Sequence, residues 1–84
     1  MEKIGLAPEG KQYVLRTVSI SGRVKDILNF VQEEFTDSLQ TAKKRIKTGG
    51  LLVAVRSKSE ADKHVAYYAE HGLKTSYELE DELW

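Results

Sequence analysis

Apolar residues near the start of the chain recur with the two-residue period of a β-strand. From Tyr13 to Ile20 the sequence is rich in β-branched residues, and Ser21-Gly22 ends the run, as turn residues do after a strand. Because side chains alternate between the two faces of a strand, Val14, Val18 and Ile20 are expected to share one face. The pattern therefore predicts a first strand over residues 13–20.

The spacing of the apolar residues then changes to that of an amphipathic helix. Apolar residues recur with helical spacing between about residues 23 and 35 and form one stripe, made of Val24, Ile27, Leu28, Val31 and Phe35. Thr36-Asp37-Ser38 interrupts this helix and offers side-chain oxygens that can cap another. In that second helix Leu39, Ala42 and Ile46 keep helical spacing, and Gly49-Gly50 ends it.

Two strands and one helix are predicted in the remainder of the chain. The run Leu51–Val55 is wholly apolar, as expected of a buried strand. Ser57 and Glu60 have the spacing of a capping box, and a third helix follows with an inner stripe of Ala61, His64, Val65 and Tyr68. Gly72 is its expected stop, and the alternation of Thr75, Tyr77 and Leu79 with polar residues predicts a last strand.

The resulting order β-α-α-β-α-β predicts an α+β fold. Three strands hide one face by placing the helices over it, which gives a two-layer sandwich with a three-stranded sheet and helices on one face. The first strand is expected to lie between the other two and antiparallel to both. We expect a flexible N-terminal lead-in over residues 1–11, a single α/β domain over 12–79 and an acidic C-terminal end over 80–84.

Size and composition narrow the function classes. Eighty-four residues suit one small domain that has little room for a deep pocket beside its core. The chain has no cysteine, which excludes disulfides and thiolate metal sites and agrees with a reducing compartment. Its longest apolar run has five residues, too few to span a membrane, and its N-terminus does not have the pattern of a secretory signal. A cytoplasmic location is expected, without membrane partners.

Charge is balanced overall but unevenly distributed. Basic and acidic side chains number five and five in residues 1–35, six and one in residues 36–58, and two and seven in residues 59–84. A neutral total disfavours non-specific binding to nucleic acid, and a bipolar surface suits a protein partner. The basic segment 43–58 still supplies candidate nucleic-acid contacts, although no aromatic residue lies among them to stack on bases: Lys43, Lys44, Arg45, Lys47, Arg56 and Lys58.

A set of residues in and around the helices indicates a resemblance to known families: Gln32-Glu33, Leu39, Ala42, Lys43, Ser57-Lys58-Ser59-Glu60-Ala61 and Gly72. With these residues the chain resembles, over residues 13–79, the C-terminal domain of the bacterial ribosomal stalk protein, whose fold is shared by the substrate adaptor of the Clp protease. The resemblance implies a fold that serves protein binding, with an ATP-driven unfoldase as one candidate partner.

The chain departs from both families at their binding residues. Asp37-Ser38 stands where the stalk domain has a glycine-rich turn, and only Arg23 and Lys25 remain near the basic positions of its first helix. The segment Ser19–Gly22 replaces the Asn-Asp-Asp stretch that introduces the acidic pocket of the Clp adaptor. The resemblance therefore implies a shared fold and not a shared binding pocket.

No combination of residues in the sequence indicates catalysis, a metal or a cofactor. The histidines His64 and His71 lie seven residues apart on the third helix, about 10 Å, which is too far for one metal ion. His64 is expected to border the core, and His71 to act as a cation at the end of the helix. The serines around Glu60 are explained by capping, and Gly49-Gly50 lacks the lysine of a phosphate-binding loop.

The expected function is therefore a small non-catalytic protein-interaction module, an adaptor or modulator of a larger protein machine. Two surfaces are candidates, the first helix pair and the acidic C-terminal edge, and their candidate residues are Arg23, Lys25, Tyr67, Glu78, Glu80, Asp81, Glu82 and Trp84. The alternative is an RNA- or ribosome-associated factor that uses the basic segment. Self-association through a sheet edge is a third possibility.

Overall fold

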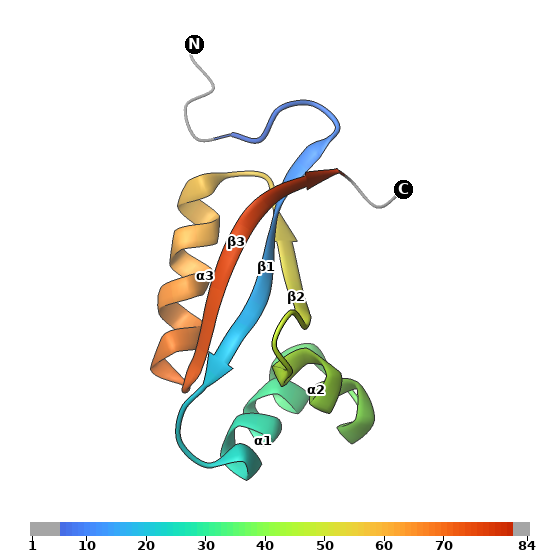
Figure 1. Cartoon of the computed structure of the whole chain (residues 1–84), viewed down its shortest axis with the longest axis vertical. Coiled ribbons are helices and arrows are strands. Elements are labelled where there is room, and N and C mark those ends of the chain that lie inside the picture. Colours follow the sequence, from blue (N-terminus) through green and yellow to red (C-terminus); the bar gives the residue numbers. More distant parts are fainter. Residues whose placement is uncertain (1–5, 82–84) are drawn as a thin grey trace.

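The computed structural model describes residues 6–81, which fold into three strands and three helices around one core (Figure 1). The elements are β1 (Lys11–Ile20), α1 (Val24–Phe35), α2 (Leu39–Ile46), β2 (Leu51–Val55), α3 (Lys58–Glu70) and β3 (Leu73–Asp81). The predicted order β-α-α-β-α-β and the α+β class are confirmed.

The sheet has the strand order β2-β1-β3. β1 pairs antiparallel with both neighbours, so the predicted central position of the first strand is confirmed. α3 lies along the sheet in Figure 1, whereas α1 and α2 form a pair at one end of it. This arrangement leaves the second face of the sheet without a helix from any of residues 6–81.

Serine side chains begin α2 and α3 as the sequence predicts. The Ser38 hydroxyl accepts a hydrogen bond from the Thr41 N–H at 3.3 Å, and the Ser57 hydroxyl accepts one from the Glu60 N–H at 3.1 Å. These bonds satisfy N–H groups that have no partner inside the helix. α1 ends at Phe35, and Thr36, which follows it, adopts a left-handed conformation with φ of 55°.

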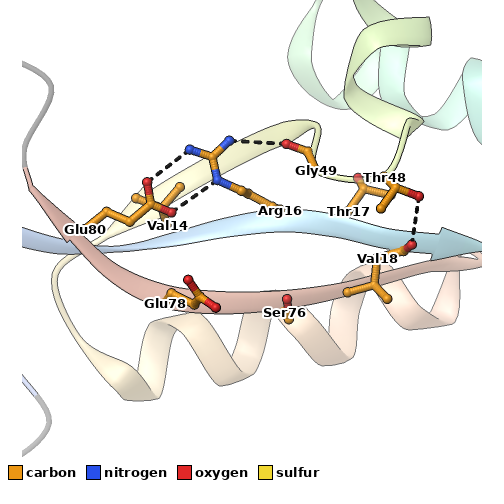
Figure 2. Close-up of a pocket in the computed structure, with 9 residues that line it drawn as sticks. All are labelled: Val14, Arg16, Thr17, Val18, Thr48, Gly49, Ser76, Glu78 and Glu80. Carbon is orange, nitrogen blue, oxygen red and sulfur yellow. Dashed lines mark hydrogen bonds and ion pairs between the residues drawn. The ribbon is translucent and has the colours of Figure 1, made fainter.

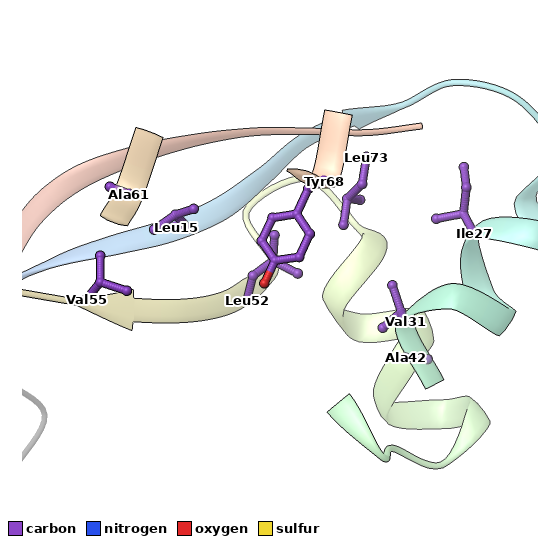
Figure 3. Close-up of a cluster of buried hydrophobic side chains, with 9 residues drawn as sticks. All are labelled: Leu15, Ile27, Val31, Ala42, Leu52, Val55, Ala61, Tyr68 and Leu73. Atoms are coloured by element: carbon purple, nitrogen blue, oxygen red, sulfur yellow. The ribbon is translucent and has the colours of Figure 1, made fainter. Parts of the chain in front are cut away.

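The helices and the sheet share a single hydrophobic core (Figure 3). Leu15 and Leu52 of the sheet contribute to it, and Tyr68 of α3 lies between them and the α1–α2 pair. Ile27, Val31 and Ala42 complete the core at the end formed by α1 and α2. The predicted helical stripes thus face the core, with two exceptions. Val24 and Leu39, which are 49% and 47% exposed, occupy the first turns of α1 and α2.

The prediction for the faces of β1 is wrong. Val14 and Val18 line a hollow on the helix-free face, whereas Leu15 and Ile20 pack in the core. The cause is a β-bulge, because Thr17 pairs with Thr75 and Ser19 with Lys74, which leaves Val18 as an extra residue in β1. A bulge breaks the two-residue alternation on which the prediction depended.

Both ends of the described chain are tied to the sheet. Leu6 bridges to Ser57, and the Ala7 N–H donates to the Arg56 carbonyl at 2.6 Å, so part of the predicted lead-in 1–11 is anchored. β3 continues to Asp81, which pairs with Lys11 of β1. The predicted acidic end 80–84 therefore begins inside a strand.

Candidate functional site

A group of aromatic rings lies where α1 meets α3, with Tyr67 and His71 exposed and Phe30 partly buried against the core. It consists of Phe30, Tyr67 and His71 and is called the aromatic surface below. The Phe30 and His71 rings are stacked, with centroids 4.0 Å apart and planes 9° apart. Tyr67 lies edge-on to both, at 5.7 Å from Phe30 and 5.0 Å from His71. Each ring thereby holds the others in a fixed orientation.

Acidic side chains border the aromatic surface. The Tyr67 hydroxyl donates to Glu34 Oε1 at 2.8 Å, which ties α3 to α1. This hydrogen bond raises the pKa of the Tyr67 phenol, and Glu70 raises it further by its charge. The surface thus combines apolar rings with negative charge, a combination that suits an apolar side chain next to a cationic one.

A shallow hollow adjoins Tyr67. Its volume is about 230 Å³, and its lining residues are Glu34, Lys63, His64 and Tyr67. His64 Nδ1 lies 2.8 Å from the Glu60 carbonyl oxygen, and because a carbonyl only accepts, Nδ1 carries the proton and donates. The hollow opens to solvent beside the aromatic surface and enlarges the area available to a partner.

The remaining partner-binding candidates do not form one surface with Tyr67. Arg23 and Lys25 are exposed at the start of α1, and Phe30 follows about one and a half turns further along the same helix. Glu78 and Glu80 line the hollow on the helix-free face of the sheet, the opposite side from α3. Glu82 and Trp84 lie outside the described residues.

The acidic edge is largely neutralised within the chain. Arg16 donates two hydrogen bonds to the Glu80 carboxylate, at 3.1 and 3.0 Å, and a third to the Gly49 carbonyl (Figure 2). Asp81 pairs with Lys11 at 2.7 Å. These partners lower the pKa values of Glu80 and Asp81, in each case mainly through the hydrogen bond. Glu78 is the one predicted acidic residue of β3 without a hydrogen bond or ion pair to any of residues 6–81.

The basic segment is divided into two groups by β2. Lys43, Lys44 and Lys47 are exposed around the end of α2. Arg56 and Lys58 lie beyond β2, a strand of five residues or roughly 15 Å. The candidate contacts therefore form two separate groups, one at each end of β2.

The two arginines of the basic segment have structural roles. Arg45 donates to Asp37 and to the carbonyls of Leu51 and Leu52, the latter at 2.9 and 3.2 Å, and its guanidinium lies 4.3 Å from the Phe35 ring centre. Arg56 donates to the carbonyls of Lys11 and Ala7. Both side chains join segments that are distant in the sequence.

Nothing among residues 6–81 gathers the groups needed to hold a metal ion, since no three His, Cys, Asp or Glu side chains cluster there. The hollow of about 270 Å³ on the sheet face holds Ser76 and two carboxylates but no histidine (Figure 2). None of the helices in the described part of the chain has the length and apolar character needed to cross a membrane.

The sequence identified Tyr67 as a candidate partner-binding residue, but it did not indicate that Phe30 and His71 lie next to it. Phe30 lies outside the predicted apolar stripe of α1. A large apolar residue beside such a stripe is the sequence feature from which an additional contact surface could have been predicted. The role of Arg16 had no sequence signal, because its partner Glu80 is 64 residues away. Comparisons of the chain with protein-family models, with curated proteins and with solved structures give no match.

Proposed function

We propose that this chain is a small, non-catalytic protein-interaction module of the cytoplasm, an adaptor or modulator of a larger protein machine such as a Clp-type unfoldase. The observation that carries the proposal is the aromatic surface. Tyr67 is 39% exposed yet held by two rings and by a hydrogen bond to Glu34, so it loses little further freedom on binding.

The chemistry of the surface defines the partner it would bind. Aromatic rings that are fixed before binding serve as anchors at protein interfaces. Glu34 and Glu70 both act electrostatically on Tyr67, so the partner segment carries an apolar side chain with a lysine or arginine beside it. The resemblance to the Clp adaptor fold agrees with this role through fold alone.

The surface is also poorly suited to catalysis. The hollow beside Tyr67 is shallow, and its histidine donates Nδ1–H to a helix carbonyl of its own chain. A nucleophile with an activating base and a sheltered oxyanion site is not assembled among its lining residues. The lining is consistent with contact to a protein segment.

The test is affinity capture from an extract of the source cells, with and without nuclease, by three immobilised chains. These are the wild type, Tyr67→Ala, and a triple variant with Lys43, Lys44 and Lys47 changed to glutamate. A nuclease-resistant protein captured by the wild type and the triple variant but lost with Tyr67→Ala supports the proposal. Titration of that purified protein should then show a Kd at least tenfold weaker for Tyr67→Ala.

Two results would contradict the proposal. Capture that disappears with nuclease and with the triple variant would indicate the alternative, an RNA- or ribosome-associated factor that uses the lysines of α2. Capture that is unchanged by Tyr67→Ala would exclude the aromatic surface as the binding site.

Truncation of the chain after Leu79 is not a suitable test of the acidic C-terminal edge as a binding site. It removes Glu80 and leaves Arg16 without the carboxylate that accepts its hydrogen bonds.

A further inference from the structure

The two edges of the sheet are protected to different degrees. β2 is five residues long, and the carbonyls of Leu51 and Leu52 accept hydrogen bonds from Arg45. β3 is nine residues long and has no proline or glycine, and the bulge in its pairing with β1 lies on β1. Natural proteins usually interrupt or cover an edge strand of this length.

The outer edge of β3 has backbone groups available for pairing. In an antiparallel strand the N–H and C=O groups of alternate residues point to opposite sides, and β1 uses one side of β3. The other side receives no strand from the part of the chain that the structure describes. A further strand can therefore add to the sheet at this edge.

The charges of β3 are complementary to those of a second copy. On the helix-free face Lys74 and Glu78 form no ion pair with any of residues 6–81, whereas Glu80 is held by Arg16. Antiparallel pairing centred on Ser76 places Lys74 of each copy opposite Glu78 of the other. The same register places Leu79, which is 46% exposed, opposite Leu73, which is already buried in the core, so the charged pairs carry the choice of register.

Other registers are less favourable. Pairing centred on Tyr77 would place Lys74 opposite Glu80, whose carboxylate already accepts two hydrogen bonds from Arg16. It would also place the apolar Leu73 opposite Asp81. Only the register centred on Ser76 places opposite each other the two charges of β3 that form no ion pair with any of residues 6–81.

The helix beside this edge allows a second copy to approach. α3 packs on β3, where Asp62 accepts a hydrogen bond from the Tyr77 hydroxyl at 2.7 Å. One and two turns after Asp62 the helix presents Ala66 and Ala69, both exposed. Small side chains at these positions leave room for the α3 helix of a second copy at ordinary helix-packing distance.

From these observations we infer that two copies of this chain associate through their β3 edges, antiparallel about a two-fold axis at Ser76. The product is a continuous six-stranded sheet with all helices on one face, since a two-fold axis perpendicular to the sheet keeps the faces aligned. The aromatic surface takes no part in this contact. The dimer and the proposed function can therefore fail independently.

The experiment is sedimentation equilibrium of the purified chain over a concentration series that reaches high micromolar, with a charge-exchange set of variants. We expect a monomer–dimer equilibrium for the wild type. Lys74→Glu and Glu78→Lys each replace two attractive contacts by two repulsive ones and should weaken the dimer by about tenfold or more. The double variant exchanges the two charges and so restores both attractive pairs. It should return the dissociation constant to within about threefold of the wild type.

The matched control is Lys44→Glu, the same charge change at an exposed position on α2, which should leave the dimer unchanged. Far-UV circular dichroism establishes that each variant is folded. A strictly monomeric wild type at every concentration would overturn the inference. A dimer that survives the single reversals, or that the double variant does not restore, would also overturn it, because the contact would then lie elsewhere.

Discussion

Arg45 offers the sharpest test of how the α1–α2 pair is fastened to the sheet. Its side chain is 23% exposed, and that of its partner Asp37 is 11% exposed, so this ion pair is intermediate between a surface pair and a buried one. The arginine also donates to two carbonyls of β2 and lies over the Phe35 ring. We therefore consider Arg45→Met, which retains the apolar stem and removes the guanidinium.

The cost follows from the contacts that are lost. Breaking a fully buried pair costs about 3–5 kcal/mol, an exposed pair contributes about 0–1 kcal/mol, and the cation–π contact adds about 0.5–1 kcal/mol. For this intermediate site we expect a loss of about 2–3 kcal/mol in the free energy of unfolding. In a domain of this size that lowers Tm by about 10–20 °C and the urea midpoint by about 2 M.

The assay is urea unfolding followed by circular dichroism, with Lys44→Met as the control. Lys44 is the exposed neighbour of Arg45, and its replacement makes the same change in charge, so it should cost less than about 0.5 kcal/mol. Asp37→Asn should be clearly destabilising in the wild type and nearly neutral in the Arg45→Met background. Equal midpoints for Arg45→Met and Lys44→Met would refute the reasoning, and Arg45 would then be an ordinary surface cation.

Three further predictions concern the backbone and the titrating groups. Gly72→Ala should destabilise the fold by about 2 kcal/mol or more in thermal unfolding, because Gly72 has φ of 80° and an added Cβ would collide with the Ser21 carbonyl. Burial raises the pKa of Tyr68 to about 12, above its usual 10.0, so the stability from its neutral phenol is present below pH 10 and is lost as pH rises toward 12. Tyr68→Phe should therefore lose less stability than the wild type over that range in urea unfolding at stepped pH. The hydrogen bond from Arg16 lowers the pKa of Glu80 in the folded chain. The stability that this pair contributes is therefore present above the usual pKa of 4.5 and is lost as pH falls through the lower folded pKa. Glu80→Gln should accordingly lose less stability than the wild type when pH is lowered through this range.

Controls and contrary outcomes for these predictions are specific. Gly22→Ala meets no atom within 4 Å and bears only the strain of its φ of 95°, so a cost as large as that of Gly72→Ala would exclude the collision as the cause. Parallel alkaline profiles for the wild type and Tyr68→Phe would mean that this phenol does not titrate differently on folding. An unchanged acid profile for Glu80→Gln would mean that the Arg16 pair contributes nothing to stability.

The element order could be predicted from the sequence because its signals are local. The serines at positions 38 and 57 sit where each helix begins, and the apolar residues of α3 repeat at helical spacing over consecutive turns. The central place of β1 also followed, since a helix joins β2 to β3 and leaves room for one strand between them. The capping and periodicity signals depend on neighbours within a few residues in the chain, and the strand order follows from the order of the elements.

The features that were missed depend on contacts between distant segments. The bulge at Val18 is set by how β1 pairs with β3, so the alternation of the sequence could not reveal it. Arg45 was grouped with its basic neighbours, although its partner Asp37 precedes α2 and its other contacts lie on β2. The extension of β3 to Asp81 depends on Lys11, which lies 70 residues earlier. Charge alone could not distinguish an arginine that fastens the fold from one that faces solvent.

The bulge in β1 also determines where the length of this chain can vary. A strand of regular alternation cannot lose one residue without turning every following side chain to the opposite face. Val18 is the extra residue between two paired positions, so its deletion would let Ser19 and Ile20 keep their partners Lys74 and Leu73. The central strand therefore contains one position at which a single-codon deletion preserves the core, and natural variants one residue shorter are expected to have their gap there.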